Sequence, residues 1–279
     1  MKKNLNKGTI ILLSIGLVSL LSGIFLGTQF AILILLILIL IYLIVTKKHY
    51  IKVFKGTKSY KLEDYKKALE YYRDAAMSPW ANAPIITNYL ICELKYGKPS
   101  LAKEYINENL KIKNVKPHDF INLEVTKSIV IWKTTSKEEA ITSLKKLLHN
   151  NKSTYIYETL TSFLLFSNKF DEAKDYINEA MEFNPDNNII KSNYAEICYK
   201  LEKFDEAKKH FDTLINENVR FIEPYYYTAL IENKNGNFEK SIELLRKAQE
   251  LNESLVSLIS QSDVEQALNC ILVKSLNSI

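Results

Sequence analysis

Carboxylates that could do acid–base or metal chemistry lie in one hexapeptide that the chain contains twice. KFDEAK spans residues 169–174 and again residues 203–208, so the pair Asp171 and Glu172 recurs as Asp205 and Glu206. Neighbouring carboxylates serve as a general acid and base, or as ligands of a hard metal ion. A weaker copy places Phe238 one further interval of the same length along the chain. The recurrence has to be explained before any chemistry is assigned to these acids.

The other reactive side chains stand alone in the sequence. The four His residues form no HExxH pattern, and the chain has no P-loop, GxGxxG or GxSxG motif. The three Cys residues are far apart and lack metal-ligand spacing, which favours buried single thiols in a reducing compartment. They are Cys92, Cys198 and Cys270. We therefore expect a protein that is not an enzyme and that binds neither a metal nor a cofactor.

The charge of the chain is divided unevenly. Residues 1–61 hold nine Lys and no Asp, Glu or Arg, whereas the remainder holds 28 Lys plus Arg against 32 Asp plus Glu. The basic side chains thus belong to the N-terminal part, and the rest of the chain is slightly acidic. This distribution argues against nucleic acid as the main partner. The Lys-, Asn- and Ile-rich composition is typical of a bacterium with an AT-rich genome.

The N-terminal part is strongly apolar, with no charged side chain in residues 9–45. One helix of this length would extend about 55 Å, whereas the hydrocarbon core of a bilayer is about 30 Å thick. We therefore predict a transmembrane hairpin in residues 1–48, with spans at about 9–27 and 30–46. The turn is expected at Gly27-Thr28-Gln29.

Lysines flank both predicted spans, and the turn between them has no charge. Because basic flanks stay in the cytoplasm, we expect a multi-pass protein of the cell membrane with both termini cytoplasmic. One alternative is a cleaved signal peptide, but a second apolar run follows at once and no clear A-x-A cleavage site is present. Another is a pair of buried helices in a soluble protein, but residues 32–41 have no polar face.

Three small residues lie on one face of the first predicted span. Ser19, Gly23 and Gly27 are spaced at i, i+4 and i+8, which lets a second helix approach closely. We expect this face to pack the hairpin against itself near the turn. The alternative use is association between copies of the chain.

The interval between the two copies of KFDEAK, about 34 residues, falls in the range that indicates stacked repeats. The alanine of the motif belongs to a series of small residues at nearly this interval: Ala68, Ala102, Ala140, Ala173, Ala207 and Ser241. Positions +4 and +7 from each are mostly apolar, which is one stripe of a helix, and Asn109 is the exception. Another helical stretch precedes each marker after the first: residues 85–96, 120–134, 155–167, 189–201 and 224–235. Turn signals separate the two helices of each pair.

The sequence at this point resembles the tetratricopeptide repeat (TPR) family. Tyr194 and Ala195 stand at the family's Leu-Gly positions, and further core positions are matched by Phe204, Ala207, Phe211 and Leu214. The preceding unit matches through Phe170, Ala173, Ile177, Ala180 and Pro185, the following one through Phe238 and Ala248, and the first through Gly56, Tyr65, Ala68, Tyr72 and Ala75. Units two and three depart from the pattern, because Pro99 and Lys137 replace the aromatic residue.

The resemblance implies an all-α fold, in which the hairpin is followed by a TPR-like α-solenoid of about six helix pairs. The pairs are expected at about 49–82, 83–118, 119–153, 154–187, 188–221 and 222–254, with a C-terminal capping helix in 255–279. Ser262-Asp263-Val264-Glu265 is expected to open that helix as a capping box. In KFDEAK, the Phe then packs between paired helices and the acids occupy the first turn of the second helix. The carboxylates need no catalytic role.

In the family, the first helix of each pair lines a groove that holds peptides or helices. Aligning the units gives a column of mostly Lys, with large residues just before it: Lys61, Lys95, Lys133, Phe166, Lys200 and Lys234. With Trp132 and Tyr199, the residues Lys95, Lys133, Lys200 and Lys234 are the candidates for the groove, and they suit an acidic, partly apolar peptide. The alternative is that Lys is favoured at helix C-termini by the helix dipole alone.

The function expected from these features is a membrane-anchored scaffold or adaptor, which binds a protein or peptide in the concave groove of a cytoplasmic TPR superhelix. The alternative is a regulatory or assembly subunit of a membrane enzyme or transport complex, recruited through the transmembrane hairpin.

Overall fold

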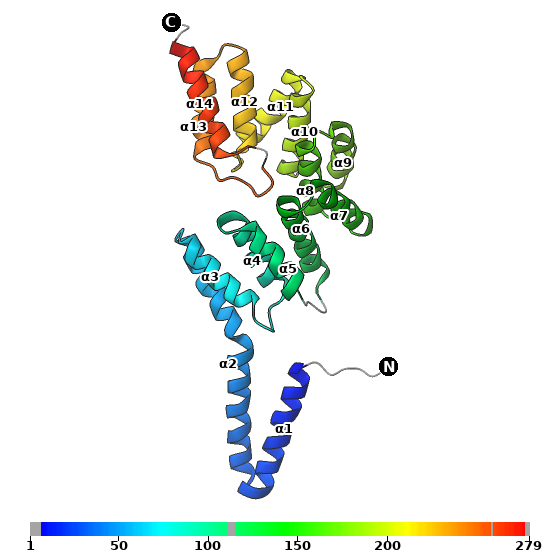
Figure 1. The fold of residues 1–279 in the computed structure, drawn as a ribbon, viewed down its shortest axis with the longest axis vertical. Coiled ribbons are helices and arrows are strands. Elements are labelled where there is room, and N and C mark those ends of the chain that lie inside the picture. Colours follow the sequence, from blue (N-terminus) through cyan, green and yellow to red (C-terminus); the bar gives the residue numbers. More distant parts are fainter. Residues whose placement is uncertain (1–6, 111–114, 258, 277–279) are drawn as a thin grey trace. The chain divides into compact units, whose positions relative to one another are not determined.

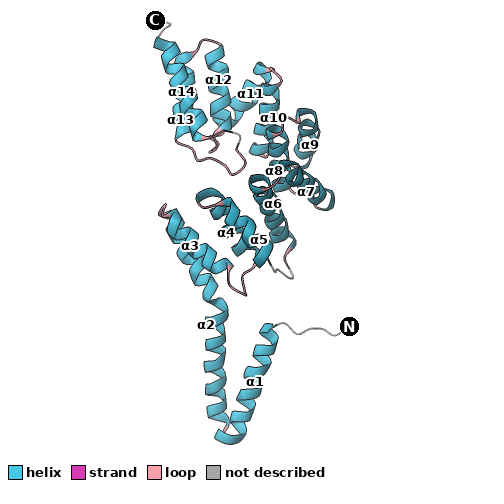
Figure 2. Ribbon diagram, in the orientation of Figure 1, coloured by secondary structure: helices cyan, strands magenta, loops and turns pink. Residues whose placement is uncertain are grey.

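The computed structural model describes residues 7–110, 115–257 and 259–276, and within α1 it describes the side chains of residues 10–21. These residues form fourteen helices and no strand (Figures 1 and 2). The chain divides into two compact units, Met1–Tyr89 and Leu90–Ile279.

The first unit contains α1 (Lys7–Leu26), α2 (Thr28–Lys61) and α3 (Tyr65–Ala76), and helix α4 (Ala83–Tyr96) begins in it. Among the described residues, α2 is the one helix that is long and apolar enough to cross a membrane, while the apolar stretch described in α1, Ile10–Leu21, is shorter. Two spans were expected from the sequence. The structure thus supports one candidate membrane helix, and the two-span hairpin stays a prediction.

Helix α2 continues well past the predicted end of the second span at residue 46. Nothing in residues 45–61 stops it, because this stretch has no Pro and a single glycine, Gly56. That glycine lies where α2 packs against α3, and a Cβ there would lie 3.0 Å from ring carbons of Tyr72. Thr57 and Tyr72 share a hydrogen bond of 3.1 Å between their hydroxyls. The end of α2 therefore serves as the partner helix of α3.

The second unit is a series of paired helices followed by a terminal helix. Their bounds are α5 (Pro99–Asn109), α6 (Pro117–Thr134), α7 (Lys137–Asn150), α8 (Thr154–Phe166), α9 (Phe170–Phe183), α10 (Asn188–Lys200), α11 (Phe204–Asn216), α12 (Glu223–Lys234), α13 (Phe238–Gln249) and α14 (Gln261–Leu276). The observed breaks fall at the turn signals read from the sequence, such as the one before Pro99 and the one after Thr134. We call α4, α6, α8, α10 and α12 the first helices.

The turns inside the last three helix pairs share one backbone conformation. Asn168, Glu202 and Gly236 occupy equivalent positions in successive pairs, and their φ angles are 55°, 59° and 80°. The next residue donates its N–H back into the preceding helix, as in Lys169 to the Leu164 carbonyl (2.9 Å) and Lys203 to the Cys198 carbonyl (2.9 Å). This is the Schellman arrangement, in which a left-handed residue ends the helix.

KFDEAK begins immediately after that left-handed residue. Its Phe is the first residue of the second helix, at Phe170 in α9 and at Phe204 in α11, and its two acids lie in the first helical turn. The alanines Ala173 and Ala207 are fully buried. Small side chains there let the paired helices approach closely. The hexapeptide is therefore a structural element of the helix pair.

The terminal helix α14 begins at Gln261, and its capping box lies two residues earlier than expected from the sequence. The N–H of Ser260 donates to the carboxylate of Asp263 (2.8 Å), and the N–H of Asp263 donates to the Ser260 hydroxyl (3.2 Å). The expected pair, Ser262 and Glu265, is exposed. Val264, the first residue of the apolar stripe of α14, is fully buried within the core of the last helix pairs. The burial of Val264 fixes where the helix begins and therefore which residues form the capping box.

Candidate functional site

The first helices of the second unit form one side of the repeat array. Consecutive first helices contact each other, α6 with α8, α8 with α10, and α10 with α12. Each second helix also contacts the first helix of the next unit, as α7 does with α8 and α11 with α12. Because α6, α8, α10 and α12 contact one another directly from pair to pair, they line the inside of the array, and the end of α4 shares a hollow with Lys133 of α6. We call this surface the inner groove.

A segment of the chain itself lies on the inner groove. Residues 251–257, which we call the returning segment, belong to the loop that joins α13 to α14 (Figure 1). Leu251, Asn252, Glu253, Ser254 and Leu255 of this segment share a hollow with residues of α4 and α6, and Ser254 and Val256 close a small cavity over α8, α10 and α12. The returning segment therefore runs beside the first helix of every pair in the second unit.

The end of the groove at α4 and α6 is open and basic. A hollow of about 300 Å³ is lined there by Leu94, Lys95, Tyr96 and Lys133 on the helix side. Lys95 and Lys133 are exposed. Partial desolvation lowers the pKa of the Lys133 amine, and the nearby Glu253 carboxylate of the returning segment opposes this shift. Two of the lysines selected from the sequence are thus brought together at one hollow.

The end of the groove at α10 and α12 is closed and acidic. Glu196 is only 2% exposed, and its carboxylate accepts a hydrogen bond from the Tyr227 hydroxyl (2.9 Å). Burial raises the pKa of Glu196 to about 8, although the Tyr227 hydrogen bond and the Lys200 charge oppose this. Burial also raises the pKa of Glu223, whose carboxylate accepts a hydrogen bond from Ser257 of the returning segment (2.5 Å).

Polar side chains continue between the two ends of the groove. Asn193 on α10 donates to the Thr161 hydroxyl on α8 (2.7 Å), and Asn187 donates to the carboxylate of Glu158 (2.7 Å). The cavity beneath Ser254 and Val256 has a volume of about 30 Å³ and is lined by Ser162, Ser192, Asn193, Glu196 and Glu223, with Ile189 and Phe221. A floor of this composition can be solvated, so it is not a hydrophobic core that must stay covered.

The two aromatic candidates pack between neighbouring first helices. Trp132 stacks on Phe163 of α8, with ring centroids 4.0 Å apart and planes inclined by 14°. Tyr199 packs against Tyr227 of α12 at 4.7 Å. Both are half-buried. Their rings therefore join successive repeats, and only part of each side chain remains accessible to a ligand.

The remaining two lysines of the candidate set are placed differently from Lys95 and Lys133. Lys200 lies near the acidic end, with its ammonium 5.7 Å from the centroid of the Tyr227 ring. Lys234 stacks over Phe204 of α11, 3.6 Å from the ring centroid, which is a cation–π contact with the preceding pair. The column is therefore not a continuous ladder of free cations.

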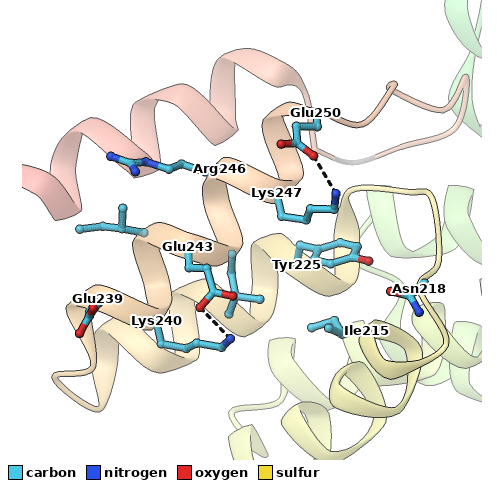
Figure 3. A pocket seen from close by; sticks show the side chains of 11 residues that line it. Ile215, Asn218, Tyr225, Glu239, Lys240, Glu243, Arg246, Lys247 and Glu250 are labelled. Atoms are coloured by element: carbon cyan, nitrogen blue, oxygen red, sulfur yellow. Dashed lines mark hydrogen bonds and ion pairs between the residues drawn. The ribbon is translucent and has the colours of Figure 1, made fainter.

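A second hollow, of about 630 Å³, lies over the exposed face of α13 (Figure 3). Four of its charged side chains form two ion pairs along that helix, Lys240 with Glu243 at 2.9 Å and Lys247 with Glu250 at 2.7 Å. These are exposed i,i+3 pairs, which contribute little to recognition or stability. Among the described residues, no group of three or more His, Cys, Asp or Glu side chains could hold a metal ion.

The predicted packing face of the first apolar helix is partly visible. The hydroxyl of Ser19 on α1 lies 3.2 Å from the Ala31 carbonyl on α2 and donates to it. Gly27 lies between the helices with φ 88°, and nothing lies within 4 Å of a Cβ added to it. Its role is therefore the backbone turn and not a helix contact, because only glycine adopts this conformation readily. The surroundings of Gly23 lie outside the described residues.

Glu196, Glu223 and the whole returning segment were missed at the level of the sequence. The sequence did not show which polar residues of the first helices are buried and which face solvent, because these residues lie beside a segment from a distant part of the chain. One signal was available. Residues 254–260 read SLVSLIS, which is neither a helical stripe nor a typical polar linker.

Comparison with known families supports the fold. Two tetratricopeptide repeat models match the chain, one at residues 164–230 and the other at residues 223–255. Within the second unit, tetratricopeptide repeats are thus found in residues 164–255. The TPR matches cover the acidic end of the inner groove, and they include both copies of KFDEAK. No curated protein sequence matches the chain significantly.

Solved TPR structures resemble the chain over most of its length. A tetratricopeptide repeat protein from Parabacteroides merdae superposes with a TM-score of 0.65 at 14% identity, covering 94% of this chain and 99% of that one. The pilF protein of Pseudomonas aeruginosa gives a TM-score of 0.53 at 11% identity, covering 82% of this chain and 99% of that one. At such identities the likeness shows the all-α TPR fold alone.

Proposed function

We propose that this chain is a membrane-anchored scaffold whose inner groove binds a non-helical segment of another protein. The TPR fold is generally used to bind protein partners, which supports the class of function. The observation that carries the proposal is the returning segment, because a non-helical piece of chain, with a turn at Ser254–Ser257, already lies along the first helices. A scaffold of this kind raises the local concentration of its partner at the membrane and does no chemistry itself.

The membrane part of the proposal rests on α2. Its apolar residues, such as Phe30, Leu36 and Ile44, are exposed in the structure, as expected of side chains that face lipid. A group of lysines between positions 47 and 61 follows directly. Because basic flanks stay in the cytoplasm, we propose that the repeats are cytoplasmic and that α1 and α2 cross the membrane as a hairpin.

Site-specific photo-crosslinking of the full chain in its native membrane tests where a partner binds. A photoreactive residue in place of Lys133 or Lys200 should capture the partner, whereas the same residue in place of the exposed Lys174 on α9 should not. Capture only from a position on the apolar helices, such as Leu20, would instead favour the alternative of a subunit recruited into a membrane complex. That result would overturn the groove proposal.

The native cysteines offer a test of topology. Cys270 is exposed, whereas Cys92 and Cys198 are buried, and burial raises the pKa of Cys92 to about 11. A membrane-impermeant maleimide should therefore modify only Cys270 of the folded chain, because the thiolate is the reactive form. Labelling in inverted vesicles but not in intact cells is the expected result. Labelling in intact cells would place the repeats outside.

A further inference from the structure

The returning segment bridges two groups of opposite charge in the inner groove. Its Glu253 carboxylate lies near Lys133 at the basic end, and its Ser257 hydroxyl donates to Glu223 at the acidic end. Val256 lies between them, over Ser162 and Asn193. The order of groups along the segment thus matches the order of groups along the groove.

Leu251 at the start of the segment and Ile259 just after it pack in the core of the last helix pairs, and the groove contact of residues 252–257 between them is light. Asn252, Glu253 and Ser254 are exposed, and Leu255, Val256 and Ser257 are half-buried. Beside the segment the hollow of about 300 Å³ stays unfilled. The segment is anchored mainly at its end, where the Gln261 side chain contacts the Leu251 carbonyl and the Gln261 N–H donates to Glu253 (2.5 Å).

The floor under the segment is polar, so uncovering it exposes groups that water can solvate. The buried Glu196 lines the cavity that Ser254 and Val256 close, so removing the segment opens the surroundings of its carboxylate to water. Releasing the segment therefore costs a small apolar area and returns hydration to two carboxylates. A surface with this balance can exchange one bound segment for another.

We propose that the returning segment is a ligand of the inner groove supplied by the chain itself, which a partner segment must displace. The inference rests on the proposed function of the groove. It also specifies the partner's chemistry. The partner is a non-helical segment with a carboxylate for Lys95 and Lys133. At the spacing of Glu253 and Ser257, which the turn at Ser254–Ser257 sets, it carries a hydrogen-bond donor or a cation for the carboxylates of Glu196 and Glu223. Such a partner is bipolar along its length and not simply acidic.

Competition in trans tests this proposal on the full chain in detergent. The probe is a fluorescein-labelled peptide with the sequence of residues 250–260. Wild type should bind it weakly, since the tethered segment competes at an effective concentration on the order of millimolar. Ser257→Glu places a carboxylate against Glu223, and it should expel the segment. We expect hydrogen exchange of residues 251–257 to accelerate at least tenfold, and the peptide to bind at least tenfold more tightly.

Ser262→Glu is the matched control, because it adds the same charge at an exposed position of α14 and should change neither measurement. Lys133→Glu is the second variant, chosen because Lys133 is exposed and its replacement leaves the core intact. It should also release the segment, and a peptide carrying Lys in place of its Glu253 should bind it better than the native peptide does.

Two results would overturn the proposal. One is unchanged exchange in the returning segment of both variants, which would make it a fixed part of the fold. The other is a released segment with no gain in peptide binding. If the peptide experiment fails, a partner can still be captured by photo-crosslinking in the groove. If photo-crosslinking captures no partner, the peptide can still bind the groove after the segment is released. The two proposals therefore fail separately.

Discussion

The two ends of the inner groove both carry charged side chains, but these have opposite charge and different burial. At the α4–α6 end the charged groups are exposed lysines beside an open hollow, and at the α10–α12 end they are carboxylates covered by the chain. An exposed ammonium keeps its hydration, whereas a buried carboxylate must find hydrogen bonds or become neutral. The exposed lysines of the basic end therefore require little desolvation free energy and can adjust to a ligand. The carboxylates of the acidic end require much more desolvation free energy, and their hydrogen bonds depend on the packing around them.

Replacing Tyr227 should have the largest effect on this contrast. Its side chain is 2% exposed, its ring stacks on Phe211, and its hydroxyl donates to Glu196. Tyr227→Ala should lower the free energy of unfolding by about 3–5 kcal/mol, because it leaves a cavity and removes that hydrogen bond. Trp132→Ala at the basic end is the matched variant and should cost less, since Trp132 is half-buried. Urea unfolding measures both, and equal losses would contradict the contrast.

Stability should depend on pH through Glu196. Its pKa is about 8 in the folded chain against an ordinary value of 4.5, so between these values the folded chain holds a proton that the unfolded chain has lost. Stability therefore falls as pH rises through this window, by up to about 1.4 kcal/mol per pH unit. Glu223 and Tyr227 lie nearby and Lys200 opposes the shift.

Glu196→Gln cannot titrate and should flatten that dependence, which urea unfolding at pH 5 and pH 8 would measure. Glu182→Gln, at an exposed position of α9, should leave the slope as in wild type. A slope that persists in Glu196→Gln would mean that the buried carboxylate is not its source.

Substitutions in the turns after the first helices should change the free energy of unfolding by an intermediate amount, and this change is independent of the groove. Glu202 has φ 59°, which is unfavourable for a residue with a side chain. Glu202→Gly should raise the free energy of unfolding by about 0.5–1 kcal/mol. Asn168→Gly should gain less at φ 55°, because Asn tolerates this region better. Equal gains in thermal or urea unfolding would refute the conformational argument.

Reversing the charge of Lys133 should have the smallest effect on stability. Because this side chain is exposed, Lys133→Glu should change the free energy of unfolding by about 0.5 kcal/mol or less. The same variant should nevertheless accelerate hydrogen exchange in the returning segment. A large loss of stability would show that the basic end is as tightly coupled to the fold as the acidic end.

Much of the fold could be predicted from the sequence, since it depends on local and periodic signals. The repeat interval located the starts of α9, α11 and α13 at Phe170, Phe204 and Phe238. The turn signals located the ends of α4 and α6. Features that depend on contacts between distant residues, or on the full length of a helix, were predicted less accurately. The length of α2 was underestimated, because its apolar and charged halves suggested two elements while the backbone met no helix breaker.

The candidate site was predicted only in part, because its residues come from distant parts of the chain. The sequence selected Lys95 and Lys133, which lie at one hollow, but also Lys234, which stacks on Phe204. By itself the sequence determined the repeat, the helix pairs and the apolar N-terminal helix, since each depends on neighbouring residues and a regular period. Only the tertiary structure decided which polar groups are buried and what covers them. Ser254, Val256 and Ser257 return from a distant part of the chain to the carboxylates at the acidic end, and no local pattern encodes that contact.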